Sequence, residues 1–202
     1  NGCERNPEEC FEYLKKAINK GNDEAMLLYG KYLFIGRGIE DNEEEGMRYI
    51  KMSMDKGNAD AIYYYGRCLF LGDSIPADIK EGVRLMKLSA EKGSIDGFIG
   101  YAILLWNGIC MDVDEDEALK YIKMGIKKNN ALSMDTYCYF IDNYKKRNIE
   151  TDEKIDKKEV ANLYKREMKK GDTYALVLYA NMLNTGDGIP ADIKKALKLY
   201  KK

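Results

Sequence analysis

The chain has 202 residues, and its 33 basic and 34 acidic side chains give a net charge of -1. This balance provides no general attraction to phosphate backbones or anionic lipids, so it disfavours nucleic acid as the main partner. The sequence also has no apolar run near the roughly 18 residues that cross a bilayer, and residues 1–10 lack the order of a signal peptide. We therefore expect no membrane insertion.

A marker residue recurs along the chain at a fixed spacing. Gly21, Gly57 and Gly93 stand 36 residues apart, the series continues through Asn129, and it resumes at Gly171 after a six-residue insertion. Eight residues after each marker lies a tyrosine, and these are Tyr29, Tyr65, Tyr101, Tyr137 and Tyr179. Such a period predicts a stacked array of helical repeats, each of which buries its apolar face against its neighbours.

The markers divide the chain into one array over residues 1–202. We expect a partial repeat at 1–20, full repeats at 21–56, 57–92 and 93–128, a divergent repeat with an insertion at 129–170, and a truncated repeat at 171–202. The chain starts without Met and stops at Lys202, inside an expected helix. We therefore expect it to be a piece of a longer array.

The first helix of each repeat, here called helix A, has clear signals. In the first full repeat Asn22 is suited to cap a helix that runs to about Ile35, and Ala25, Tyr29 and Leu33 share one helical face. A small residue stands one position after each of the five repeated tyrosines, and these are Gly30, Gly66, Ala102, Cys138 and Ala180. We expect a neighbouring helix to approach closely at these positions.

The second helix, helix B, begins after a glycine-rich turn. Gly36 and Gly38 are suited to end helix A, because glycine accepts the left-handed backbone found just beyond a helix. N-caps follow at Asn42, Asp78, Asp114 and Asp192. Glutamates three residues later, at Glu45, Glu81 and Glu117, predict capping boxes in the first three repeats.

The fourth repeat departs from this pattern. Tyr144 and Lys146 replace the two glycines of the turn, and polar residues fill 145–156. We expect a longer helix A and a projecting loop. The loop is either a tolerated surface insertion or a protrusion or hinge that serves a partner.

The pattern Ala25-x3-Tyr29-Gly30-x2-Leu33-x2-Gly36-x-Gly38-Ile39-x2-Asn42 and its copy over residues 61–78 resemble the Sel1-like repeat, a relative of the tetratricopeptide repeat. The resemblance covers nearly the whole chain and is weakest in the fourth repeat. It implies an all-α fold, a right-handed α–α superhelix of stacked helix–turn–helix repeats. It also implies an adaptor that binds a partner polypeptide on the concave face. The resemblance leaves a structural spacer or a self-associating array as alternatives.

Counting 100° per residue from the inward positions places a second set of side chains on the opposite side of helix A. In the related tetratricopeptide fold these positions line the concave groove, so they form the candidate partner-binding site. We expect apolar side chains of an extended or helical peptide to enter between the aromatic rings, and an acidic group to meet Lys31 or Arg67. Alternatively, Phe34, Phe70 and Trp106 are buried between neighbouring helices. The candidate residues are Lys31, Phe34, Tyr63, Tyr64, Arg67, Phe70, Ile103 and Trp106.

The chain offers few residues for catalysis. It has no histidine, so triads and metal centres that need imidazole are excluded. The acidic run 112–117 lacks the glycine and glutamate of a calcium loop and is expected to be a solvated helix start. We therefore expect no catalytic, cofactor or metal site and no enzyme activity.

The five cysteines do not recur at one repeat position, which favours free thiols in a reducing compartment such as the cytoplasm, although Cys3 and Cys10 are close enough in sequence to pair. Some cysteine-rich relatives are described as β-lactam hydrolases. They carry a regular cysteine pair in each repeat, which is missing here. Hydrolysis is therefore only a remote alternative.

Overall fold

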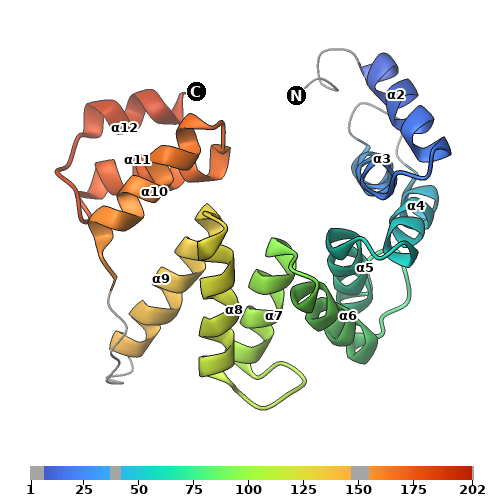
Figure 1. The fold of residues 1–202 in the computed structure, drawn as a ribbon. Coiled ribbons are helices and arrows are strands. Elements are labelled where there is room, and N and C mark those ends of the chain that lie inside the picture. Colours follow the sequence, from blue (N-terminus) through green and yellow to red (C-terminus); the bar gives the residue numbers. More distant parts are fainter. Residues whose placement is uncertain (1–6, 37–41, 147–154, 202) are drawn as a thin grey trace. The chain divides into compact units, whose positions relative to one another are not determined.

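The computed structural model describes residues 7–36, 42–146 and 155–201, and every regular element in these ranges is an α-helix (Figure 1). This confirms the predicted all-α repeat architecture. None of the helices in these ranges is long and apolar enough to span a membrane. The helices are α2 Pro7–Asn19, α3 Asp23–Ile35, α4 Glu43–Asp55, α5 Ala59–Leu71, α6 Ile79–Glu91, α7 Ile95–Asn107, α8 Glu115–Lys127, α9 Ala131–Lys146, α10 Lys157–Lys169, α11 Thr173–Thr185 and α12 Ile193–Tyr200.

The chain forms two compact units, residues 1–113 and residues 114–202. The first unit contains α2 to α7 and the second contains α8 to α12. In the first unit, the pairs α3 with α4 and α5 with α6 are the helix A and helix B of successive repeats. In the second, α11 with α12 is such a pair.

The ends of helix A result from local chemistry. The side chain of Asn22 accepts a hydrogen bond from the N–H of Ala25 at 2.7 Å, and α3 ends at Ile35, so both predicted bounds are confirmed. Gly36 then takes a left-handed backbone with φ of 61°. The same left-handed cap recurs after α5, α7 and α11 at Gly72, Gly108 and Gly186. Each of these repeats thus turns at a position where glycine is the residue with the least strain.

Helix B begins at the predicted N-caps, but the capping differs from the expected box. Asp78 accepts from the N–H of Glu81 at 3.0 Å, which is the predicted half. The N–H of Asp78 itself donates to the carbonyl of Leu69 at 3.0 Å, and the Glu81 carboxylate pairs with Arg84 at 2.6 Å. The cap N–H of helix B is therefore bonded to the last turn of helix A rather than to its own glutamate.

The same contact recurs in other repeats. Asn42 donates its backbone N–H to the Leu33 carbonyl at 2.9 Å, and Asp192 donates to the Leu183 carbonyl at 2.8 Å. The Leu carbonyl belongs to the set that the end of an α-helix leaves without a partner. One bond therefore satisfies two helix ends and fixes how helix B leaves helix A.

Helices A and B of a repeat cross at the predicted small residues. A Cβ atom on Gly30 would lie 2.7 Å from the carbonyl oxygen of Gly46, and one on Gly46 would lie 2.8 Å from that of Gly30. In the next repeat, a Cβ on Gly82 would lie 2.7 Å from the oxygen of Gly66. The two backbones are in direct contact at this crossing, so the prediction of close approach is confirmed in these two repeats.

The five repeated tyrosines, here called the tyrosine column, lie largely between the packed helices. Tyr29, Tyr101, Tyr137 and Tyr179 are buried, and Tyr65 is half-buried. The ring of Tyr29 makes an edge contact with Tyr49 of α4, at 4.9 Å between centroids. The column therefore contributes to the core of each unit.

Polar contacts that the sequence analysis did not identify hold the first turn of helix A. The hydroxyl of the buried Ser53 donates to the carbonyl of Asp23 at 2.7 Å, and the buried Ser89 donates to that of Ala59, also at 2.7 Å. The side-chain amide of Asn58, the cap of α5, donates to the Asp23 carboxylate at 3.0 Å. This hydrogen bond is the main cause that lowers the pKa of Asp23. The start of α3 is thus held by helix B of its own repeat and by the cap of the next helix A.

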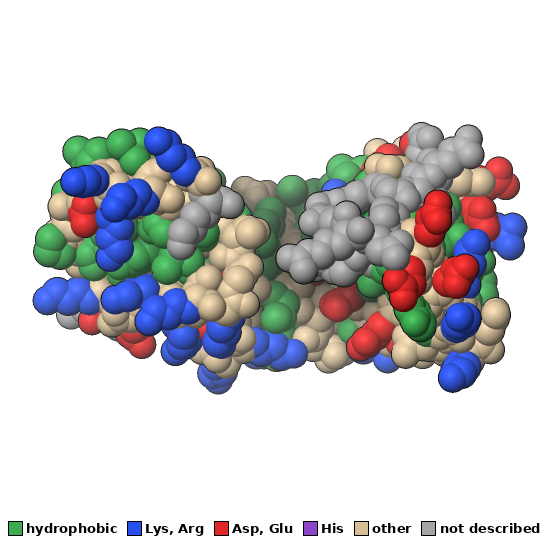
Figure 2. All heavy atoms as spheres, turned by 90° about the horizontal axis from the view of Figure 1, so that it is seen from above, with side chains coloured by type: hydrophobic (Ala, Val, Ile, Leu, Met, Phe, Trp, Pro, Cys, Tyr) green, Lys and Arg blue, Asp and Glu red, His purple; other side chains and the backbone are tan. Residues whose placement is uncertain are grey.

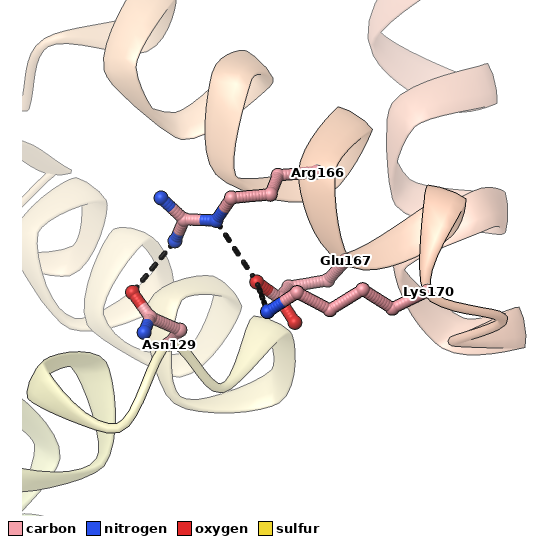
Figure 3. A network of polar contacts seen from close by, with 4 residues as sticks. All are labelled: Asn129, Arg166, Glu167 and Lys170. Carbon is pink, nitrogen blue, oxygen red and sulfur yellow. Dashed lines mark hydrogen bonds and ion pairs between the residues drawn. The ribbon is translucent and has the colours of Figure 1, made fainter.

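Asn129 takes the place that glycine has in the marker series, and it has a left-handed φ of 60°. Figure 3 shows its side chain beside α10, where Arg166 Nη2 donates to Asn129 Oδ1 at 2.6 Å. Arg166 and Lys170 also each contact the Glu167 carboxylate at 3.0 Å. These two cations, Lys170 first, lower the pKa of Glu167. A polar network therefore holds the one marker turn that lacks glycine.

The fourth repeat has the longer helix A that its sequence predicted. The helix α9 has 16 residues, against 13 for α3, α5, α7 and α11. Residues 147–154 lie outside the described ranges, so the predicted projecting loop there stays a prediction.

The outer face of α12 carries exposed apolar side chains. Leu197 and Tyr200 are 55% and 44% exposed, whereas the residues at the same positions of α4, Met47 and Ile50, are buried. Figure 2 shows Lys and Arg side chains beside hydrophobic ones over the part of the molecule that holds α10 to α12. In α4 this face is covered by the next helix A. In α12 no described residue covers it.

The backbone contact at the crossing leads to a stability prediction. The change Gly46→Ala should lower the free energy of unfolding by about 1–3 kcal/mol, because the added methyl meets backbone atoms that cannot rotate away. This effect should outweigh the roughly 1 kcal/mol that alanine gains in helix propensity. Urea unfolding measures the difference. The exposed Glu44→Ala on the same helix is the control, and a Gly46→Ala protein at least as stable as wild type would contradict the prediction.

Candidate partner-binding face on α3, α5 and α7

The predicted site residues come from three successive A helices of the first unit. Lys31 and Phe34 lie on α3, Tyr63, Tyr64, Arg67 and Phe70 lie on α5, and Ile103 and Trp106 lie on α7. Because the three helices begin at equivalent caps and belong to one compact unit, equivalent positions are presented on one side.

Tyr64 lies at the centre of a cation–aromatic cluster. Lys31 Nζ is 5.0 Å from the centroid of its ring, and Arg67 Cζ is 5.3 Å from the same centroid. The ring of Phe34 meets it edge-on, at 5.8 Å and 88°. The structure therefore brings these four predicted residues together across α3 and α5. Cations over an aromatic face are attracted by about 0.5–1 kcal/mol at exposed sites, so both cations are kept near the ring.

Tyr63 forms the link to the third helix. A Cβ atom on Gly100 would clash with Tyr63 Cε2, so the tyrosine ring lies directly on the backbone of α7. Gly100 was not among the candidate residues predicted from the sequence. A glycine in the middle of a helix could have indicated this contact. Glycine is about 1 kcal/mol less favourable than alanine at such a position, and it is expected where a neighbouring side chain leaves no room for a Cβ atom.

Two carboxylates share the electrostatic field of this face. Asp96 keeps an exposed edge, but partial desolvation by surrounding protein atoms raises its pKa above the usual range, and Asp60 adds to that effect. Lys31 and Arg67 act in the opposite direction and lower it. Burial likewise raises the pKa of Tyr63, followed by the nearby charge of Asp96. The face is therefore a mixed surface, with cations, carboxylates and aromatic rings close together.

The remaining predicted residues differ in how much surface they offer. Ile103 is 39% exposed, whereas Trp106 is only 7% exposed. Phe70 is half-buried against α6, since a Cβ on Gly82 would lie 2.7 Å from its backbone nitrogen. Trp106 thus chiefly supports the helices. Ile103 is exposed, and the other six candidates are half-buried, namely Lys31, Phe34, Tyr63, Tyr64, Arg67 and Phe70.

Three of the cysteine thiols are free. Cys68, Cys110 and Cys138 are unpaired, while the suggested partner of Cys10, Cys3, lies outside the described residues. Burial raises the pKa of Cys68 to about 11, so this thiol is protonated at neutral pH. It behaves as a small apolar side chain in the core rather than as a nucleophile.

The Sel1 repeat family matches residues 1–22, 23–58, 59–94, 99–130 and 173–202. The chain belongs to the Sel1 repeat family. Residues 131–172, most of the divergent fourth repeat, are not matched. No curated protein is significantly similar to the chain in sequence.

Solved structures share the fold. A Sel1 repeat protein from Oxalobacter formigenes is 22% identical with a TM-score of 0.60, and the match covers 99% of this chain and 79% of that one. A protective antigen of uropathogenic Escherichia coli strains, which displays an SLR fold, is 19% identical with a TM-score of 0.59, over 95% and 40% of the two chains. An immunity protein from Pseudomonas aeruginosa is 14% identical with a TM-score of 0.65, over 94% and 70%.

These likenesses establish the architecture. Sel1 repeats generally mediate protein–protein interaction, and scaffold proteins built from them are generally non-catalytic. The partner of this chain and the surface that binds it are not given by the family.

The electrostatics of the face lead to a titration prediction. Removing a cation that stabilises the charged form should raise the pKa of Asp96 further, so Lys31→Met should move it upward from its already raised value. Carboxyl NMR titration of both proteins measures this. The control change Lys15→Met on α2 should leave the pKa of Asp96 unchanged. An unmoved pKa in Lys31→Met would show that Lys31 does not face this carboxylate.

Proposed function

We propose that this chain is a protein-binding scaffold and that its partner polypeptide binds across α3, α5 and α7. The observation that carries the proposal is the cluster around Tyr64, in which two cations and two aromatic rings are positioned on one face. Tyrosine and arginine are among the residue types that contribute most to interface energy.

The chemistry of the face defines the partner segment. Tyr63, Tyr64 and Ile103 provide apolar and aromatic contact surface, and Lys31 and Arg67 provide donors for a carboxylate. An extended or helical segment with an acidic side chain beside apolar ones fits this surface. Asp96 lies within electrostatic reach of both cations and of Asp60, which disfavours a segment with several adjacent acidic residues.

Self-association is the second candidate function. The observation in its favour is the exposed apolar face of α12, with Ile193, Leu197 and Tyr200. It predicts that the chain forms concentration-dependent oligomers in sedimentation velocity and that Leu197→Glu abolishes them. A chain that is monomeric at all concentrations would remove this candidate.

Photocrosslinking tests the partner-binding proposal. A photoreactive amino acid at Ile103, which is 39% exposed, should give a discrete crosslinked protein in a lysate of the source cell. The matched control is the same amino acid at Met52 of α4, which is 42% exposed and lies off the face. The product should appear at Ile103 alone, and mass spectrometry identifies the partner. Equal products from both positions, or none at Ile103, would contradict the proposal.

Charge reversal provides a second test of the same face. The double variant Lys31→Glu, Arg67→Glu should lower the yield of the Ile103 product at least about tenfold, because charge-assisted hydrogen bonds contribute about 1.5–3 kcal/mol each. The control Lys51→Glu, Lys80→Glu carries the same change in net charge on two B helices, at exposed positions. Thermal unfolding of both variants shows whether the loss is one of binding. Equal yields in the two variants would mean that the cations of the face do not contact the partner.

A further inference from the structure

The second unit contains a cavity that is separate from the α3–α5–α7 face. It has a volume of about 190 Å³ and is lined by side chains of α9, α10 and α11 and of the turn after α11. One liquid water occupies about 30 Å³, so the cavity has room for a small organic group. The lining residues that carry polar or ionisable groups include Asp135, Cys138, Lys157, Tyr164, Asn181 and Asp187.

The cavity lies at the helix crossing of the fourth repeat, where the glycine pair of the first two repeats is absent. The positions that Gly30 and Gly46 occupy in the first repeat are Cys138 and Val160 here, counted from the helix caps Asn130 and Asp156. Both Cys138 and Val160 line the cavity.

The inner wall of the cavity presents hydrogen-bond donors. Tyr164 is 3% exposed as a whole residue, and its side chain lines the cavity. Burial strongly raises the pKa of Tyr164, so the hydroxyl keeps its proton. Burial also raises the pKa of the Cys138 thiol, to about 11. A ligand acceptor in the cavity would accept a hydrogen bond from the Tyr164 hydroxyl.

The mouth of the cavity holds a cation and two carboxylates. Lys157 Nζ lies 3.0 Å from Asp187 Oδ2, and the hydroxyl of Tyr174 donates to Asp135 Oδ2 at 2.9 Å. Asn181 Oδ1 accepts from Tyr200 at 2.6 Å, which leaves the N–H groups of this amide for another acceptor. The second carboxylate oxygens of Asp135 and Asp187 can accept further hydrogen bonds. The mouth therefore offers donors and acceptors within one small space.

The charges and the hydrogen-bond donors and acceptors of the lining residues indicate the class of ligand. Two carboxylates against one lysine give a net charge of -1, which opposes an anion. An ammonium group has no acceptor for the hydroxyl of Tyr164 or the amide of Asn181, and it would face the charge of Lys157. A primary carboxamide carries an acceptor for the inner donors and two N–H groups for the carboxylates. Val160, Leu178 and Met182 line the rest of the cavity and suit a short aliphatic stem.

We propose that this cavity binds a primary carboxamide on a short aliphatic stem. The carbonyl oxygen accepts from the Tyr164 hydroxyl, and the NH₂ group donates toward Asp135 or Asp187. Two sources share this chemistry, a free small amide and the side chain of a Gln or Asn in a polypeptide.

Titration with butyramide, followed by NMR of the full chain, tests the proposal. Saturable shifts are expected at Val160, Leu178 and Met182, with a millimolar dissociation constant because the ligand is so small. The isosteric anion butyrate and the cation butylammonium should produce no saturable shifts at these residues. Linear or absent shifts with butyramide, or equal binding of butyrate, would overturn the proposal.

A pair of matched variants tests the role of the buried hydroxyl. Tyr164→Phe keeps the ring and removes only the donor, so the dissociation constant of butyramide should rise by about 2- to 10-fold, as expected for one hydrogen bond. Tyr139→Phe removes the hydroxyl of a tyrosine that is exposed and does not line the cavity, and should leave the constant unchanged. Equal constants in Tyr164→Phe and wild type would remove this residue from the site. Thermal unfolding of both variants verifies that the unit is folded.

Two further probes distinguish the sources. A capped peptide, acetyl-Ala-Gln-Ala-N-methylamide, carries its primary carboxamide only on the Gln side chain, and it should bind more tightly than butyramide if the occupant is a side chain of a polypeptide. Free glutamine should bind more tightly than the peptide if the occupant is a small metabolite. If acetyl-Ala-Glu-Ala-N-methylamide binds as well as the Gln peptide, recognition of the primary carboxamide is refuted. The result is independent of the α3–α5–α7 face, because none of the titrated residues lies in that unit.

Discussion

The contact of two backbones at the crossing of helix A and helix B is the constraint on which the repeat depends. With Gly30 facing Gly46, and Gly66 facing Gly82, no side chain separates the two helices at this point. In the fifth repeat the same positions hold Ala180 and Ala196, both fully buried, so alanine also satisfies the requirement there. Close approach brings the flanking side chains of both helices into contact, which is how a hairpin of two 13-residue helices buries enough apolar surface to be stable.

Directional polar contacts set the geometry around this crossing. The cap N–H of Asn42, bonded to the Leu33 carbonyl, fixes the exit of helix B, and the hydroxyl of Ser53 on the Asp23 carbonyl fixes its far end. Asn58 then ties the next helix A to Asp23. Since the cap and serine contacts repeat along the first unit, α3, α5 and α7 present equivalent positions on one side. The proposed binding face is a consequence of this register.

What the sequence could predict depended on how far apart the interacting residues are. The cap of α3 and its end at Ile35 are local, because Asn22 acts three residues away and Gly36 acts through its own φ. The burial of Trp106 and the contact of Tyr63 with Gly100 depend on neighbouring repeats, and helical periodicity assigns a residue to a face without saying what covers that face. The capping boxes of the first two repeats formed only in their N-cap half for a similar reason, since the competing acceptors for the N–H groups of Asn42 and Asp78 lie in the preceding helix.

The fourth repeat shows the effect of relaxing the crossing. Cys138 and Val160 replace the glycine pair, the family match is lost over 131–172, and a cavity opens between the helices. The array tolerates this change because each hairpin is also held by its neighbours. The resulting pocket is formed by one hairpin and the helix that follows it, so it requires no added domain.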